Sequence, residues 1–170
     1  MKAVKVIAVL AIIGAVTWLA ILDHREIMQE RAIVSHVRNL LDACKSMGDS
    51  ASPTIKGKAL VWDMTSDSRS DAHDRLPSEL KATSADSQIT VFMVIGERNV
   101  QVGTYSVSGE PAYRQYMDVA VAYWPEKKAV GMGYVVSKEP RSSRPVEHRP
   151  EYGDPYEPIA NWISTLPKAR

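Results

Sequence analysis

The most suggestive chemistry in this sequence is a polar segment that mixes aspartates with one histidine. Segment 63–74 contains Asp67, Asp71 and His73. Carboxylate oxygens on a flexible loop can bind calcium, and clustered titratable groups are typical of hydrolase sites. The glycine and the terminal glutamate of the known calcium-binding loop are missing, and aspartate is also common in turns. We keep these three residues as metal candidates and predict no resident metal or cofactor.

A second candidate site lies in a proline-rich segment, residues 139–158. Its prolines recur every five residues from Pro140 to Pro155, which excludes regular helix or strand and predicts an extended strap. The arginines could bind a phosphate or carboxylate, or they could pair with neighbouring acidic residues and fix the strap to the domain. We favour the structural role. The candidate anion ligands are Arg141, Arg144 and Arg149.

Catalytic motifs are missing from the sequence. There is no P-loop, nucleophile elbow, paired Cys-x-x-Cys or histidine pair at metal spacing. The lone Cys44 lies on an apolar helix stripe and is expected in the core. Tyr113, Tyr116 and Tyr152 have polar neighbours, which indicates exposure and an interaction surface.

Length and charge restrict the class of protein. The chain has 170 residues and a net charge of +1, with one cysteine. This length suits one domain with an appendage, and the single cysteine excludes a disulfide scaffold. A nearly neutral chain has no global field to hold a polyanion, so we expect no nucleic-acid partner.

An apolar run near the N-terminus predicts a membrane segment. Val6 to Leu22 contains no charge, and as a helix it spans about 25 Å. Trp18 lies near its end, where indole prefers the membrane interface. A cleaved signal peptide and a buried core helix are the alternatives. The first lacks small residues at a cut site and the second lacks a polar face, so we favour an uncleaved anchor over residues 1–22.

The charges around this run suggest an orientation. Lys2 and Lys5 precede it, and three arginines follow within residues 25–38. The compact lysine cluster favours a cytoplasmic N-terminus with the domain outside. The expected localisation is therefore a single-pass membrane protein.

Residues 23–47 are expected to continue as a helix that ends near Gly48. The first half is polar and reads as a stalk. From Ile33 to Cys44, apolar residues recur at spacings of three and four, which predicts one face packed on the domain. A coiled coil through Ile27, Val34 and Leu41 is the alternative, although Glu30 breaks its apolar seam and it would contain fewer than three clean heptads.

The remaining chain, residues 48–170, predicts an α+β domain. Five strands are expected at 59–64, 88–96, 99–107, 113–124 and 129–137, in a mostly antiparallel sheet because three of the connections have hairpin length. Asp154, Pro155 and Glu157 predict the start of a short C-terminal helix that ends before Pro167. One face of this helix is expected to be apolar, with Ile159, Trp162, Ile163 and Leu166. An all-β sandwich is the alternative fold.

Two functions fit these features. The first is a non-enzymatic, membrane-tethered binding or scaffold module, with the bilayer and a protein partner or a second copy of the chain as its partners. The second is a membrane-anchored hydrolase or metal-dependent enzyme that uses segment 63–74. The two differ in whether the side chains of that segment converge.

Overall fold

The computed structural model describes residues 2–48, 53–104, 109, 111–136 and 156–169, and of residues 2–13 only the backbone. It has the predicted α+β architecture. The helices are α1 Lys2–Arg38, α2 Leu41–Met47, α3 Asp71–Asp74 and α4 Tyr156–Thr165, and the strands are β1 Lys58–Asp63, β2 Ser68–Arg69, β3 Ile89–Thr104, β4 Pro111–Trp124 and β5 Lys128–Val136.

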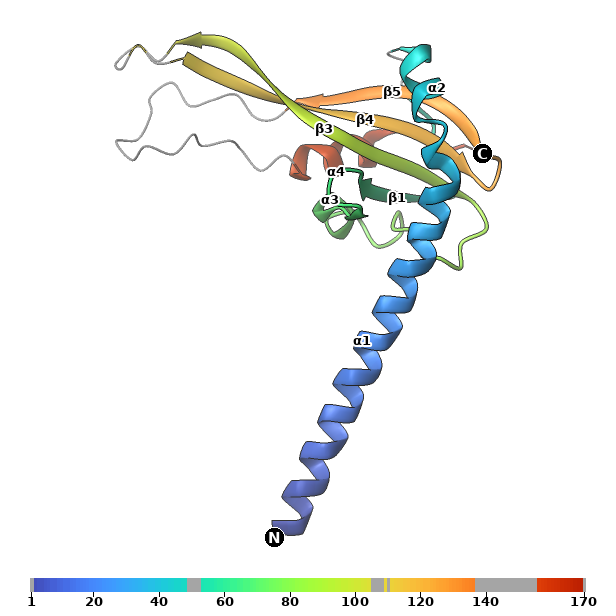
Figure 1. The fold of residues 1–170 in the computed structure, drawn as a ribbon, viewed down its shortest axis with the longest axis vertical. Helices are drawn as coiled ribbons and strands as arrows, with labels where there is room; N and C mark the ends of the chain where they lie inside the picture. Colours follow the sequence, from blue (N-terminus) through green and yellow to red (C-terminus); the bar gives the residue numbers. More distant parts are fainter. Residues whose placement is uncertain (1, 49–52, 105–108, 110, 137–155, 170) are drawn as a thin grey trace.

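One five-stranded sheet of order β2-β1-β3-β4-β5 forms the centre of the domain (Figure 1). β1 and β3 run parallel, whereas the other three strand pairs are antiparallel. The prediction of a mostly antiparallel sheet is therefore confirmed, with one parallel pair that hairpin-length connections alone did not indicate. The chain between β1 and β3 adds β2 and the short helix α3, in a region expected to be loop.

Apolar side chains cover both faces of this sheet. On one face, Leu60 and Met93 pack with buried residues of α1 and α2. On the other face, Phe92 and Val119 pack with Ile163 of α4 and with α3. The inner half of β3, Ile89–Val94, is buried throughout because it lies between these two clusters.

Strand β3 corrects the prediction of two strands joined by a turn at Glu97 and Arg98. It continues without a turn to Thr104 and pairs with β4 along this length, with a register shift between Val94 and Gly96. The sheet has five strands because β2 replaces the strand that was expected from this split. Beyond Val94, β3 has no register partner on β1 among the described residues.

Helix α1 is a long rod that stands clear of the domain at its N-terminal end (Figure 1). The expected single helix through residue 47 is wrong in one respect, because a turn at Asn39 and Leu40 separates α1 from α2. The Leu40 amide donates to the Val37 carbonyl at 3.0 Å in this turn. The turn redirects the chain so that α2 packs across β4 and β5.

At the C-terminus, α4 carries the predicted apolar face. Ile159 and Ile163 are fully buried and Leu166 is nearly so. The rings of Trp162 and Phe92 meet edge to face, with their centroids 5.8 Å apart. The prediction of a short terminal helix is confirmed. The strap at 139–158 lies almost entirely outside the described residues, as do Asp154 and Pro155.

Within the part of the chain that the structure describes, no helix is both long enough and apolar enough to cross a membrane. The transmembrane role of residues 1–22 stays a prediction. Trp18 and Leu22 of the predicted anchor are 62% and 44% exposed. Val16, Leu19 and Ile21 are exposed as well. The side chain of Val6 lies outside the description.

Candidate functional site

The second half of α1 docks on the sheet through its apolar stripe. Val34 and Val37 are fully buried and Ile33 is nearly so, and Cys44 of α2 is fully buried beside them. Their cluster includes Trp62 of β1, which is also fully buried. The prediction of packing within the chain is confirmed, because Val34 cannot serve both this core and a second helix.

A buried ion pair joins the same helix to the edge of the sheet. Glu30 is only 1% exposed, and Arg69 of β2 donates to its two carboxylate oxygens from Nε and Nη2, both at 2.9 Å. Asp23 lies 3.9 Å from Nη1 of Arg69. Such a two-pronged contact fixes both position and orientation, so it holds α1 against β2.

Asp67, one of the metal candidates, is a structural acceptor that connects a loop to α1. Its carboxylate accepts from Arg38 and from the Trp62 indole, the latter at 3.3 Å, and lies 3.5 Å from Nε of Arg31. The Arg38 hydrogen bond, followed by the Trp62 bond, lowers the pKa of this carboxyl below its ordinary value. The Asp67 carboxylate is therefore already paired with two arginine side chains of the protein.

The other acidic residues of segment 63–74 have separate positions and contacts. The Asp63 carboxylate accepts from the amides of Thr65 and Ser66 at 2.7 and 3.3 Å, which closes a turn. Asp71 is exposed on the first turn of α3. Among the described residues no three His, Cys, Asp or Glu side chains are grouped as metal ligands would be. The enzymatic alternative thus has no convergent site in this part of the chain.

His73 is a core residue beneath β1. It is 3% exposed, and its Nδ1 accepts from the Val61 amide at 3.4 Å. Burial lowers the pKa of His73 to about 4, and the charge of Arg69 adds to this effect. The imidazole is therefore neutral in the fold at neutral pH, with Nδ1 unprotonated.

The lowered pKa gives a testable pH dependence. The unfolded chain binds a proton at His73 near pH 6.5 and the folded chain near 4, so this contribution to stability is present above pH 6.5 and is lost as pH falls. His73→Asn keeps an acceptor and removes the titration. Between pH 7 and 4, we expect the free energy of unfolding in urea to fall by about 3 kcal/mol more for the wild type than for His73→Asn. Parallel stability profiles of the two proteins would contradict this.

The outer half of β3, residues 97–104, is the most exposed regular structure on the sheet. All eight of these residues are exposed, in contrast to the buried inner half. Val100 and Val102 are 40% and 44% exposed. Tyr113 on the paired strand is 41% exposed, but it lies opposite Gln101 and therefore on the other face of the sheet from Val100. Figure 1 shows β3 and β4 extending as a narrow ribbon beyond the helices. Isolated apolar residues are common on surfaces, but two valines on one projecting ribbon form a candidate contact area.

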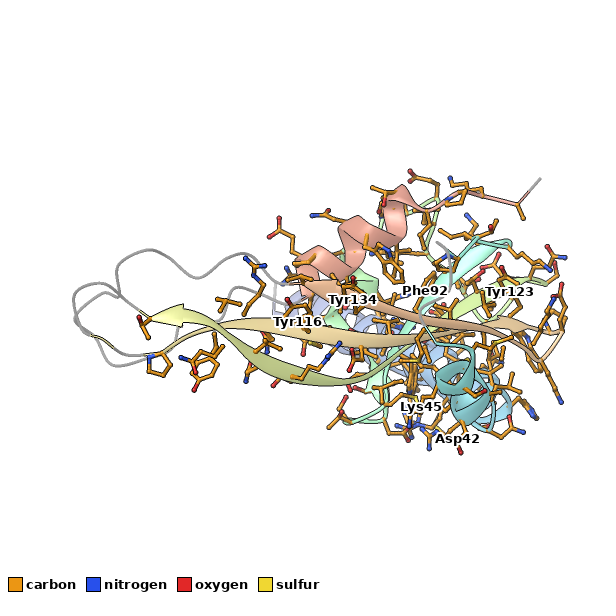
Figure 2. The ribbon with its side chains drawn as sticks, turned by 90° about the horizontal axis from the view of Figure 1, so that it is seen from above. Asp42, Lys45, Phe92, Tyr116, Tyr123 and Tyr134 are labelled. Atoms are coloured by element: carbon orange, nitrogen blue, oxygen red, sulfur yellow. The ribbon has the colours of Figure 1, made fainter. Side chains whose placement is uncertain are left out.

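An aromatic group continues this area at the base of the ribbon. Tyr116 and Tyr134 lie on β4 and β5 with ring centroids 6.3 Å apart (Figure 2). The Arg98 guanidinium lies 5.4 Å from the Tyr116 ring and 3.3 Å from the Asp118 carboxylate. Tyrosine and arginine are enriched in protein interfaces. We define the ribbon surface by five residues: Arg98, Val100, Val102, Tyr116 and Tyr134.

Of the three tyrosines for which the sequence indicated exposure, Tyr113 is exposed and Tyr116 is only half-buried, whereas Tyr152 lies outside the described residues. The candidate anion ligands Arg141, Arg144 and Arg149 also lie outside them.

Glu30 is the residue that the sequence interpretation missed. It was assigned to the polar stalk and to a break in a coiled-coil seam. Its spacing carried a usable signal, because Ile27, Glu30, Val34 and Val37 follow one another at intervals of three and four. A charge in phase with a buried stripe indicates a buried ion pair, since glutamate is almost never fully buried without a partner.

Comparison with known proteins adds no relative. No family model matches the chain, and neither a curated protein nor a solved structure matches it.

Proposed function

We propose that the protein is a single-pass, membrane-tethered binding or scaffold module that presents the ribbon surface to a protein partner. The observation that carries this proposal is the exposure of the whole outer half of β3, including Val100 and Val102. A strand that leaves the core contributes little to folding. Its apolar residues are therefore better explained by a partner than by stability.

The proposal of a membrane tether rests on the sequence of residues 1–22. Its support is the uncharged run from Val6 to Leu22 and the outward position of Trp18 on α1. In this proposal the N-terminus is cytoplasmic and the domain lies outside, as the N-terminal lysines favour. The bilayer is then one partner, and the occupant of the ribbon is another protein or a second copy of the chain.

Photo-crosslinking of the full chain in membranes tests both parts. With benzoylphenylalanine in place of Val100, we expect a carbonate-resistant membrane protein that forms one discrete crosslinked species. The matched control carries the same probe in place of Lys128, which is exposed at the start of β5, away from the ribbon. We expect no such species there.

The outcomes separate the two claims. Release of the protein by alkaline carbonate would refute the tether. Equal crosslinking at residues 100 and 128, or none at residue 100, would refute the ribbon as the binding surface. The mass of the crosslinked species distinguishes a second copy from a different protein.

A further inference from the structure

One side of the sheet carries both a layer of helices and an exposed strand surface. Ala120 of β4 packs with α1 and α2, so Asp118 and Tyr116, two and four positions away, lie on the same side. Arg98 lies opposite Tyr116, and Tyr134 lies opposite Asp118, so both belong to this side as well. Figure 1 shows α1 and α2 crossing one end of the sheet and the ribbon extending beyond them. The layer of helices therefore ends in a step beside exposed strands.

The outer side of α2 presents an acidic residue to the surroundings. Cys44 is buried against the sheet, and Asp42 lies two positions earlier, about 200° around the helix. The Asp42 side chain is 97% exposed, and its carboxylate lies 3.9 Å from Nζ of Lys45. Figure 2 shows both residues on the opposite side of the sheet from α4. Met47, at the end of α2, is exposed as well.

The charges of the strand surface are complementary to Asp42. Arg98 is exposed and lies 3.3 Å from the Asp118 carboxylate. Arg114, opposite Val100 on the same side, adds a second positive charge. Two arginines and one aspartate leave this side of the ribbon positive. A surface with an exposed carboxylate, such as the outer side of α2, therefore matches it.

We propose, building on the function proposed above, that the occupant of the ribbon surface is α2 of a second copy of the chain, and that a two-fold axis relates the two copies. Asp42 of each copy then faces Arg98 of the other, and Met47 packs against Tyr116 and Tyr134. A two-fold contact uses the same patch on both copies. Each layer of helices thus fills the step beside the layer of the other copy.

The direction of α1 favours this face-to-face arrangement over pairing between strand edges. Beyond Val94, β3 has no register partner on β1 among the described residues, so that edge is a competing contact. Antiparallel pairing of two such edges needs a two-fold axis perpendicular to the sheet. This axis would reverse α1, which lies flat on the sheet. An axis parallel to α1 instead keeps both N-terminal ends pointing the same way, as two anchors in one membrane require.

Cysteine crosslinking between two differently tagged full chains in one membrane tests the arrangement. Both chains carry Cys44→Ala, one adds Asp42→Cys and the other adds Arg98→Cys, so a product with both tags must join two copies. We expect a short bismaleimide to give this product. In the control, Gln101→Cys replaces Arg98→Cys. Gln101 is exposed on the same strand but on the other side of the ribbon, and we expect no product above background.

Charge reversal supplies a second readout on the purified full chain in detergent. Asp42→Lys should raise the dissociation constant of the dimer about 10-fold, because it replaces an ion pair across the contact by a repulsion. Glu79→Lys makes the same change of net charge on the exposed loop before β3 and should leave the constant unchanged. Adding Arg98→Glu to Asp42→Lys should restore most of the affinity. Sedimentation equilibrium measures all four proteins.

The outcomes separate this proposal from the broader one. Equal crosslinking of the two cysteine pairs, no product between residues 42 and 98, or equal effects of the two lysine variants would each overturn the second copy as the occupant. A probe at residue 100 that crosslinks a different protein would also overturn it, but would leave the proposed function intact. No crosslink at residue 100 would refute both.

Discussion

A chain that begins at residue 50 should lose the cooperative unfolding transition that a chain beginning at residue 23 retains. The truncation removes Ile33, Val34, Val37 and Cys44 from the core. At about 1.5–3 kcal/mol for each buried side chain, the loss is on the order of 6–12 kcal/mol. This is comparable with the whole stability of a typical domain, about 5–15 kcal/mol. Calorimetry on both chains measures the difference.

Two point variants in the longer chain show whether burial is the cause. Val34→Asp places an unpaired charge at a fully buried position and should lower stability by about 4 kcal/mol or more. Met28→Asp adds the same charge to the same helix at a position that is 48% exposed, and should change stability little. Equal melting temperatures for the two truncated chains would contradict the docking of α1 and revive the coiled-coil interpretation.

Replacing Gly57 with alanine should also destabilise the fold strongly. Gly57 has φ +66°, and a Cβ there would lie 2.1 Å from the backbone oxygen of Gln88. The same oxygen accepts from the Lys58 amide at 3.1 Å, where β1 begins to pair with β3. The alanine would therefore have to displace backbone at the start of the parallel pair. We expect the free energy of unfolding, measured in urea, to fall by about 4 kcal/mol or more.

Gly109 provides the matched control for backbone conformation. It has φ +70°, and a Cβ there would meet nothing within 4 Å. Gly109→Ala should therefore show only the cost of the left-handed conformation, about 1–2 kcal/mol. The same loss at both positions would mean that close approach to Gln88 contributes nothing.

Periodicity predicted the elements that are buried on one side. The apolar stripe of α1 from Ile33 and the face of α4 around Ile159 follow the helical repeat, because each packs on a sheet with its other side in water. The boundaries of β4 and β5 were also close to those predicted, since the polar residues 125–127 separate the two strands.

Most of the outer half of β3 was recognised as a strand at 99–107, but not as the continuation of the inner half. Its residues have water on both faces, so no pattern of burial links them to the buried residues before them. The polar pair Glu97 and Arg98 then resembles a turn, although it continues the pairing with β4. The two-residue strand β2 is too short for any periodic signal.

The contacts of the candidate site residues differed from those predicted for a related reason. Asp67 and His73 were noticed because acidic and imidazole groups close in sequence suggest chemistry. Their actual partners, Arg38 and Val61, come from other elements, and local spacing does not reveal them. Glu30 and Arg69 are separated by 39 positions, so only the fold identifies them as a pair.

The unbroken course of α1 has a mechanical consequence. Its 37 residues make a rod of about 55 Å, and its C-terminal turns are clamped to the sheet. No swivel separates the N-terminal end of this rod from the folded domain, so tilting one end moves the other as a lever. Rotation of the helix about its own axis would likewise turn the sheet and sweep the tip of β3 through an arc (Figure 1). A partner that binds the tip would therefore experience force and torque applied at the far end of the helix.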